Sequence, residues 1–258
     1  MFELLINLLV FIFGLIVGSF LNCVIYRLKT DKSFFEGRSF CPLCKHELAW
    51  LDLIPVVSFL MLKGKCNYCH KPISIHYPLV ELFTGLLFLL VFHHAQYSIL
   101  YALYNLVIVC FLIVIFVYDL KHYIIPDKVI YPAILVSGIF NIFLSFYTPY
   151  ALRHTLYAAL GASSFFLLIY LMSRGQWLGF GDVKLAFFMG LYLGFPNILV
   201  ALFLSFFIGA VVGLTLISWG KKTLKSEVPF GPFLVTGTII ALFCGEQLIN
   251  WYLNLLYG

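Results

Sequence analysis

Charged residues are scarce in this chain of 258 residues: Asp, Glu, Lys and Arg together make up 10% of it, against about 25% in soluble domains. Apolar residues make up 63%, and the mean hydropathy is +1.03. Such a composition cannot cover a water-exposed surface, which excludes soluble, disordered and collagen-like proteins. The net charge of +5 follows the loops and forms no basic face, so no nucleic-acid partner is expected. The composition predicts an integral membrane protein.

Long apolar runs recur along the chain. A membrane-spanning helix needs about 20 such residues, and we identify eight runs, of which the second and the sixth are short. The expected fold class is therefore an all-α integral membrane protein with about eight transmembrane helices. The runs are Leu4 to Tyr26, Leu79 to Phe92, Ile99 to Tyr118, Val129 to Phe146, Leu152 to Met172, Val183 to Leu193, Ile198 to Trp219 and Phe233 to Leu253.

Basic residues set the orientation of membrane proteins, because cytosolic loops carry an excess of Lys and Arg. With eight spans, only Arg153 of the 16 Lys and Arg residues falls on one side of the membrane. The others fall in four loops on the opposite side. This distribution predicts that these four loops are cytosolic and that both termini lie outside. The residues that carry it include Lys32, Arg38, Lys221, Lys222 and Lys225.

One long polar segment, residues 28–77, interrupts the apolar pattern and holds four of the seven cysteines. They form two C-x-x-C pairs separated by 21 residues, close to the spacing of a four-thiolate zinc site. Two disulfides or a redox pair are the alternatives, but a cytosolic position disfavours stable disulfides and a redox motif does not need a second pair. We therefore expect a cytosolic loop with structural Zn²⁺ on Cys41, Cys44, Cys66 and Cys69.

Carboxylates at the membrane edge are candidate functional groups because burying them is costly. Asp119 ends the third run, where the helix macrodipole disfavours a negative charge, so helix capping does not explain it. Asp127 follows a proline and is adequately explained as a helix N-cap. Asp182 opens the sixth run, and capping is again an alternative. However, Gly179 and Gly181 before it permit close backbone approach or a positive φ that helix initiation does not require.

Asp119 and Asp182 lie at the cytosolic ends of different spans, so a helix bundle can bring them together. Two adjacent carboxylates share a proton and titrate as a pair. In peptide hydrolysis, the ionised member takes a proton from water while the protonated member polarises the scissile carbonyl. The sequence contains no G-x-S-x-G motif, no H-E-x-x-H motif and no phosphate-binding loop. Asp119 and Asp182 are therefore the expected catalytic residues.

Several segments, in order and nearly from end to end, give the sequence a family resemblance. They are Gly18 to Arg27, Cys41 to Cys44, Trp50 to Phe59, Lys63 to Cys69, Ile73 to Glu81, Asp119 to Asp127, Gly179-Phe-Gly-Asp182 with Lys184, and Val228 to Phe233. On these segments the chain resembles the type IV prepilin peptidases, bacterial membrane aspartyl proteases of the G-x-G-D type. The G-x-G-D motif alone is weak, since other intramembrane aspartyl proteases share it.

The resemblance implies cleavage of the short basic leader of prepilins and pseudopilins after a glycine, on the cytosolic side of the bacterial inner membrane. Gly179, Gly181 and Lys184 would belong to the active-site motif. It also implies N-methylation of the new N-terminal residue with S-adenosylmethionine, because the cysteine loop is retained. Glu81 is a candidate for binding this methyl donor or for either activity; a favourable charge at a helix N-terminus is its alternative explanation.

The expected organisation has three parts: a first transmembrane helix over 1–27, the four-cysteine loop over 28–77 and a polytopic membrane aspartyl protease domain over 78–258. A different class of function is a proton- or cation-coupled transporter with a regulatory zinc loop, because intramembrane carboxylates suit it equally well. The spans show no obvious internal repeat, and only a peptidase accounts for the motifs of both loops.

Overall fold

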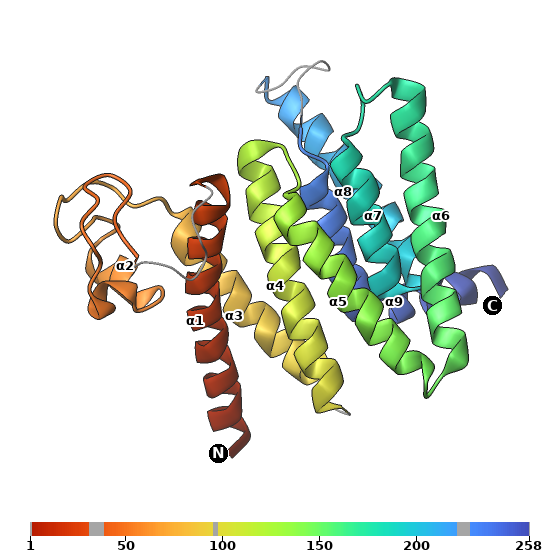
Figure 1. The fold of residues 1–258 in the computed structure, drawn as a ribbon, viewed down its shortest axis with the longest axis horizontal. Helices are drawn as coiled ribbons and strands as arrows, with labels where there is room; N and C mark the ends of the chain where they lie inside the picture. Colours follow the sequence, from red (N-terminus) through yellow and green to blue (C-terminus); the bar gives the residue numbers. More distant parts are fainter. Residues whose placement is uncertain (1, 31–38, 95–97, 221–227, 258) are drawn as a thin grey trace. The chain divides into compact units, whose positions relative to one another are not determined.

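The apolar runs form helices in the computed structural model, which describes residues 2–30, 39–94, 98–220 and 228–257 (Figure 1). Lys32, Arg38, Lys221, Lys222 and Lys225, used above for orientation, lie outside the described residues. No strand occurs in the described ranges. The long helices are α1 (Phe2–Thr30), α3 (His76–His94), α4 (Ile99–His122), α5 (Asp127–Ser145), α6 (Pro149–Ser173), α7 (Phe180–Leu193), α8 (Asn197–Ser218) and α9 (Gly231–Tyr257).

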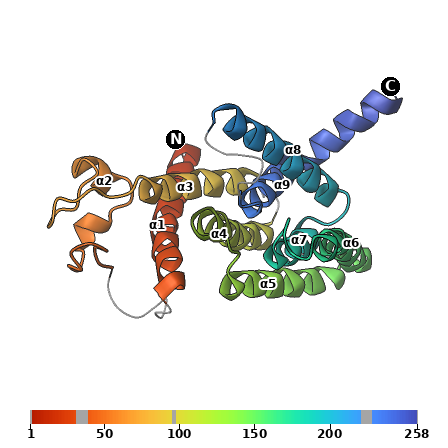
Figure 2. The same ribbon diagram turned by 90° about the horizontal axis from the view of Figure 1, so that it is seen from above.

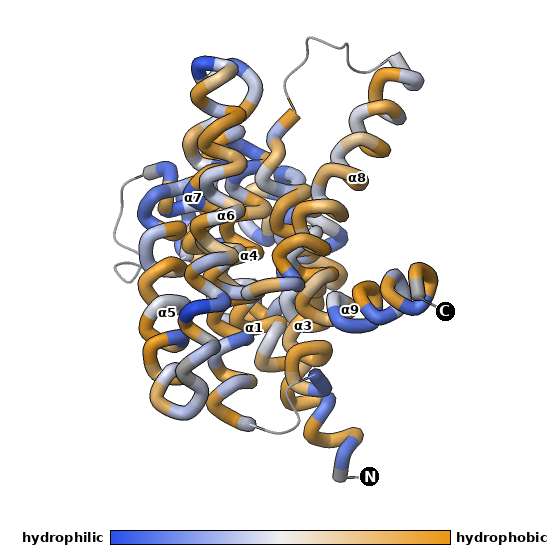
Figure 3. Tube along the Cα trace, turned by 90° about the vertical axis from the view of Figure 1, so that its right-hand side faces the viewer, coloured by the Kyte–Doolittle hydropathy of each residue, from blue (hydrophilic) through white to orange (hydrophobic). Residues whose placement is uncertain are grey.

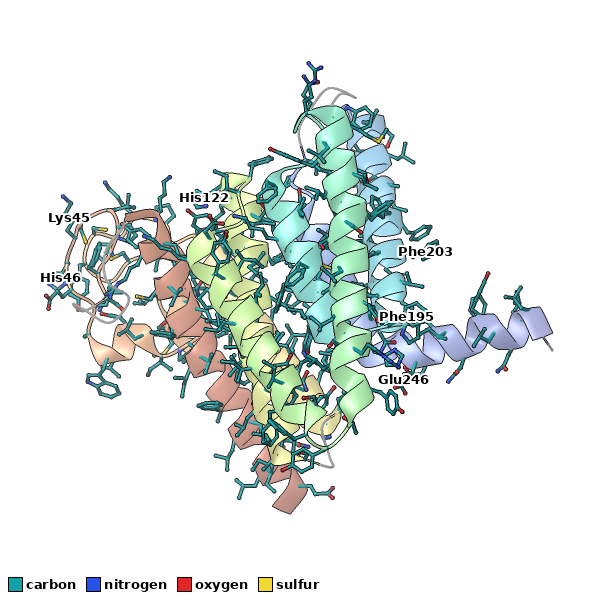
Figure 4. All side chains as sticks on the ribbon, turned by 45° about the vertical axis from the view of Figure 1, so that its right-hand side comes forward. Lys45, His46, His122, Phe195, Phe203 and Glu246 are labelled. Carbon is teal, nitrogen blue, oxygen red and sulfur yellow. The ribbon has the colours of Figure 1, made fainter. Side chains whose placement is uncertain are left out.

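Seven of these helices are long and apolar enough to cross a membrane, which makes this a multi-pass membrane protein. The sequence predicted about eight, and the difference is α7, which has 14 residues and is too short by length. Apolar residues run along the helices in Figure 3. Many of them are exposed, as Phe203 of α8 is in Figure 4, where it points away from the helix. Such apolar outer faces fit a lipid environment.

The chain divides into two compact units, residues 1–114 and 115–258, and the boundary falls within α4. In the first unit α1 packs against α3. Gly14 and Gly18, one helical turn apart, permit this contact: a Cβ atom on either residue would lie 2.7 Å from a backbone Cα of α3, that of Gly85 and Glu81 respectively. Small residues with this spacing let two membrane helices approach closely. The close contact brings Glu81 against the backbone of α1.

The four-cysteine segment folds into two similar turns in the same unit. Cys41 N–H donates to His46 O at 2.9 Å, and Cys66 N–H donates to Lys71 O at 2.9 Å. His46 stacks on Tyr68 with ring centroids 3.7 Å apart, which joins the two turns. Figure 4 shows His46 beside Lys45 at the outside of the first turn.

Between the two turns lie the short helices η1 (Trp50–Leu53) and α2 (Val57–Met61). The Tyr68 hydroxyl donates to Asp52 Oδ2 at 3.0 Å and so ties η1 to the second turn. This apolar stretch is too short to span, as the sequence indicates. Trp50 is 73% exposed and Met61 78% exposed. Both side chains are thus available to a membrane surface.

In the second unit α7 is enclosed by other helices. It packs against α5, α6 and α9, and Figures 1 and 2 both show α5, α6 and α7 side by side. A helix that is apolar all round is stable when it is buried. Accordingly, eight residues of α7 are buried, among them Asp182, Leu185, Phe188 and Met189. α7 ends at Gly194, which has a φ of 66°. The remaining close pair is α8 with α9.

Candidate active site and metal centre

Asp119 lies in the last turn of α4, within the second unit, and is only 4% exposed. Its backbone carbonyl accepts a hydrogen bond from Tyr123 N–H at 2.8 Å, where the helix ends. Its carboxylate lies directly against Gly231, so a Cβ atom on that glycine would overlap Asp119 Oδ2. Gly231 is the first residue of α9, and the N-terminus of a helix favours a negative charge. Asp119 therefore ends one helix and faces the start of another.

Asp182 lies in the first turn of α7 and is 8% exposed. Its Oδ2 accepts a hydrogen bond from the Gly179 backbone N–H at 3.1 Å, and its own N–H donates to Gly179 O at 3.1 Å. The capping contact considered from the sequence is therefore present. This contact fixes the carboxylate at the beginning of the helix.

The two aspartates interact electrostatically with each other, although 63 positions separate them in the sequence. Ile125 lies between the elements that hold them: a Cβ atom on Gly181 would meet its Cβ at 3.1 Å, and one on Gly231 would meet its Cδ1 at 3.5 Å. The end of α4, the start of α7 and the start of α9 thus converge. Two buried carboxylates that interact in this way can share one proton and act as an acid and a base.

The glycines of the G-x-G-D motif and the nearby Lys184 have separate roles. Gly181 is explained by the close approach of Ile125, whereas Gly179 has an ordinary φ of −76° and nothing crowds it.

Lys184 Nζ forms an ion pair with Asp127 Oδ1 at 2.6 Å, which ties the start of α7 to the start of α5. Asp127 is the first residue of α5 and not its N-cap, which is Pro126. The N-cap interpretation of Asp127 is therefore wrong by one position.

Sequence reasoning gave Gly231 no role at the site. The segment Val228 to Phe233 carried the family resemblance, but neither charge nor periodicity distinguished its glycine. The available signal was a glycine followed by proline where an apolar run begins, a pattern typical of a helix start. Its contact with Asp119 depends on where α9 begins relative to α4. Local sequence patterns do not reveal that position.

The four cysteines in the loop of the first unit converge as their spacing predicts. The ligand atoms of Cys41, Cys44, Cys66 and Cys69 all lie within 4.8 Å of one another. A tetrahedral zinc with Zn–S bonds of about 2.3 Å needs sulfur atoms roughly 3.8 Å apart, so the cluster is compatible with Zn²⁺. Within the described residues these four side chains are the only group of this kind.

Cys41 has the environment of a metal-binding thiolate. Burial raises the pKa of its thiol, but hydrogen bonds from the backbone of Cys44 and Leu43 and from the neighbouring thiols outweigh burial, and the pKa is lowered to about 7. A thiolate is the form that coordinates metal. The backbone of the first turn therefore favours the thiolate form of Cys41.

Glu81, in the second turn of α3, is 9% exposed and lies in the first unit. Its Oε2 accepts a hydrogen bond from Val56 N–H at 2.8 Å, and the Ser19 hydroxyl is a further partner. Val56 has a φ of 60°, which is unusual for a β-branched residue. Backbone of this kind persists only where the surrounding structure maintains it, and the hydrogen bond to Glu81 is one such support. A favourable charge at a helix N-terminus therefore does not fully explain why a glutamate stands at position 81.

Two family models match the chain. "Bacterial Peptidase A24 N-terminal domain" matches residues 12–95, and "Type IV leader peptidase family" matches residues 106–214. No solved structure matches.

Curated relatives match over nearly the whole chain. A protein of Legionella pneumophila named prepilin leader peptidase/N-methyltransferase is 34% identical, over 96% of this chain and 94% of its own length. A protein of Bacillus subtilis with the same name is 31% identical, over 97% of this chain and 99% of its own. The segments that suggested the family from sequence thus belong to a similarity that extends over both units. The chain is a member of the type IV prepilin leader peptidase family.

Proposed function

We propose that this protein is a membrane aspartyl endopeptidase that removes the short basic leader of prepilins and pseudopilins after a glycine, and that it N-methylates the residue thereby exposed. The observation that carries the proposal is the buried pair Asp119 and Asp182 in a chain of this family. The relatives carry both activities in their names. This favours the proposed function over a proton- or cation-coupled transporter.

In the proposed hydrolysis, the ionised aspartate takes a proton from water, and the oxygen attacks the scissile carbonyl. The protonated aspartate donates a hydrogen bond to that carbonyl and stabilises the developing negative charge. Gly231, which has no side chain, leaves room for the Asp119 carboxylate, and the Gly179 N–H holds Asp182 in place. Burial excludes bulk water, which strengthens these electrostatic interactions.

The substrate chemistry suits a site at a membrane edge. A basic leader would stay at the cytosolic surface of the bacterial inner membrane while the pilin helix lies in lipid. The scissile glycine would then reach the depth of the helix ends that carry the aspartates. Without a side chain, glycine lets the substrate backbone extend into a narrow site. We propose that these are the protein's location, its cytosolic active site and its lipid environment, and that nucleic acid is no partner.

The four cysteines are proposed to bind one structural Zn²⁺, which would fix the loop between α1 and α3. S-adenosylmethionine is the proposed methyl donor, and it would supply an electrophilic methyl group on a positively charged sulfur. We further propose that the first helix, this loop and the remaining membrane helices are three functional parts, with the protease machinery in the last of them.

The test uses the purified full-length protein in lipid with a prepilin that has a Lys-rich leader and a Gly-Phe junction. Intact mass is measured with and without S-adenosylmethionine. Loss of the leader mass, followed by the gain of one methyl mass when the donor is present, supports both activities. Loss of the leader alone would refute methyl transfer. An unchanged mass with several prepilins, together with proton-coupled uptake into proteoliposomes, would overturn the peptidase in favour of the transporter.

A further inference from the structure

A cavity of about 190 Å³ lies in the first unit, between α1, the four-cysteine segment and the start of α3. Its lining is mostly apolar and contains a few convergent polar groups, as small-molecule sites do. Its volume is below the about 300–1,000 Å³ usual for such sites, so a ligand of that size would extend out of it. The proposed peptide hydrolysis uses none of these residues, because both aspartates belong to the second unit. The proposed hydrolysis therefore gives this cavity no role.

Two buried groups of opposite charge line this cavity. Glu81 comes from α3, and Arg27, only 5% exposed, comes from the last turn of α1. Burying either charge is costly unless it has partners, and both groups interact with other residues of the chain, which hold them at the cavity wall. About two turns of α1 separate Arg27 from Ser19, the hydrogen-bond partner of Glu81. The Arg27 and Glu81 side chains therefore line the cavity at different positions along α1.

Aromatic side chains complete the lining. Tyr26, Phe40, Phe59 and Tyr77 all contribute to the wall. The rings of Tyr26 and Phe40 pack edge to face, with centroids 5.8 Å apart. Aromatic faces bind flat heterocycles by stacking and attract cations through their π-electrons. A ligand suited to this cavity carries a cation, an anion and a planar ring.

We propose that this cavity is the methyl-donor site: Glu81 faces the positively charged sulfur of S-adenosylmethionine, Arg27 binds its carboxylate, and the aromatic wall holds its adenine. The inference rests on the proposed methyl transfer and assigns that activity to residues of the first unit. The donor carries all three chemical features in one molecule, a sulfonium, a carboxylate and a purine. Glu81 and Arg27 are binding and positioning residues here.

The transfer itself needs no further reactant. The neutral amine of the newly exposed residue forms the N–C bond with the methyl group as the C–S bond breaks. The electron pair of the C–S bond goes to sulfur, so a sulfonium becomes a neutral thioether and the amine becomes a methylammonium. The positive charge beside Glu81 disappears in this step, which favours release of the spent donor.

The cavity also connects the cysteine cluster to methyl transfer. Cys41 and Cys66, one from each turn, line the cavity as well as belonging to the cluster. The Val56 N–H that holds Glu81 belongs to the segment between the turns. A metal that fixes both turns would therefore fix one wall of the donor site and the carboxylate within it.

The charge assignment is tested by calorimetric titration of the full-length protein in nanodiscs with S-adenosylmethionine and with S-adenosylhomocysteine. The second compound lacks the methyl group and the positive charge. Glu81→Gln keeps an acceptor for Val56 N–H but removes the charge. We expect it to weaken S-adenosylmethionine binding about ten- to a hundred-fold and S-adenosylhomocysteine binding far less. Equal weakening of both would show that Glu81 is structural and would overturn the assignment.

Arg27 is tested with a different pair of ligands. Arg27→Gln should weaken S-adenosylmethionine and S-adenosylhomocysteine alike, and leave binding of 5′-methylthioadenosine, which lacks the carboxylate, unchanged. Loss of all three, with zinc content and prepilin cleavage retained, would refute the carboxylate contact. If Arg27→Gln does not fold, Ser58→Leu tests the cavity by filling it, because Ser58 lies in its wall on α2. Unchanged donor binding by Ser58→Leu would overturn the site.

The matched control is Glu47→Gln, the same substitution at an exposed residue of the four-cysteine segment that does not line the cavity. It should bind the donor as the wild type does, and weakening equal to that of Glu81→Gln would count against the site. Prepilin cleavage, measured in the same samples, distinguishes failure of the proposed function from failure of the proposed donor site. Cleavage by a wild-type protein that binds no donor would refute methyl transfer itself. Donor binding by the wild type that Glu81→Gln and Ser58→Leu both retain would refute only the location.

Discussion

The two units of this protein hold their buried carboxylates in different surroundings. In the first, Glu81 stands in a cavity whose wall also contains a buried guanidinium, that of Arg27. In the second, Asp119 and Asp182 interact with each other, while Lys184 of the same motif pairs with Asp127. A carboxylate and a cation in one cavity suit a ligand that carries both charges. Two carboxylates together suit the sharing of a proton.

Because these surroundings differ, one chain can carry two chemistries. Both carboxylate sites depend on a glycine that permits close contact, Gly18 against Glu81 and Gly231 against Asp119. The supporting structure differs: the first site relies on a loop that a metal can fix, and the second relies on the ends of three helices. Changes to one support should therefore leave the other activity in place.

The largest expected effect is loss of the aspartate pair. Asp119→Asn or Asp182→Asn should lower prepilin cleavage by about a thousand-fold or more, since either change removes one half of the acid and base pair. Intact mass of the prepilin measures it. Methylation of a precleaved pilin and zinc content should be unchanged. Cleavage by either variant at the wild-type rate would remove that aspartate from the pair.

Substitution of Gly231 tests the helix-end support of the second unit. Gly231→Ala places a methyl group on the Asp119 carboxylate and should lower cleavage by about a hundred-fold, because small displacements of a reacting group cost that much. Gly213→Ala in α8 is the matched control, since nothing lies within 4 Å of the added methyl group. Equal rates for the two variants would show that Gly231 does not position Asp119.

Removal of the metal ligands tests the support of the first unit. Cys41→Ser should reduce bound zinc from one ion per chain to none, and should lower methylation by about ten-fold or more, because structural zinc fixes the loop. Elemental analysis and intact mass measure the two effects. We expect cleavage to change much less. Equal loss of both activities would contradict a separable loop.

The smallest expected effect concerns the ion pair of Lys184 with Asp127. Lys184→Met should lower the free energy of unfolding by about 0.5–1 kcal/mol, because the Asp127 side chain is 60% exposed and solvent screens the pair. A double-mutant cycle with Asp127→Asn, followed by unfolding in detergent, measures the coupling. Cleavage should fall only slightly. A hundred-fold loss of cleavage with normal stability would instead place Lys184 at the reacting groups.

The sequence predicted most of the fold because its local patterns are strong. Each of the eight apolar runs became a helix, and the two C-x-x-C pairs converged as their spacing indicated. The two aspartates also came together, as their positions at the ends of different spans suggested. Their catalytic role stays a prediction until cleavage is measured.

The remaining features depend on contacts between distant segments. The sequence predicted a short span where α7 lies. In the structure this helix is enclosed by α5, α6 and α9 and does not reach spanning length. Gly231 had no role until α9 was seen to begin beside Asp119. The hydrogen bond of Val56 to Glu81 joins residues 25 positions apart through a φ that a valine rarely adopts. The hydrophobic periodicity of the sequence does not predict a hydrogen bond of this kind.

The amino-acid sequence alone predicts a helical membrane protein with a loop that can bind a metal. Lipid offers no partner for a free peptide group, so apolar runs must become helices, and a C-x-x-C turn brings two sulfurs together through a few bonds. The fold, in contrast, is needed to see which carboxylates meet, which glycines make room for them and which helix is buried. These outcomes follow from packing between helices, where each contact depends on the shapes of both partners and not on the local order of residues.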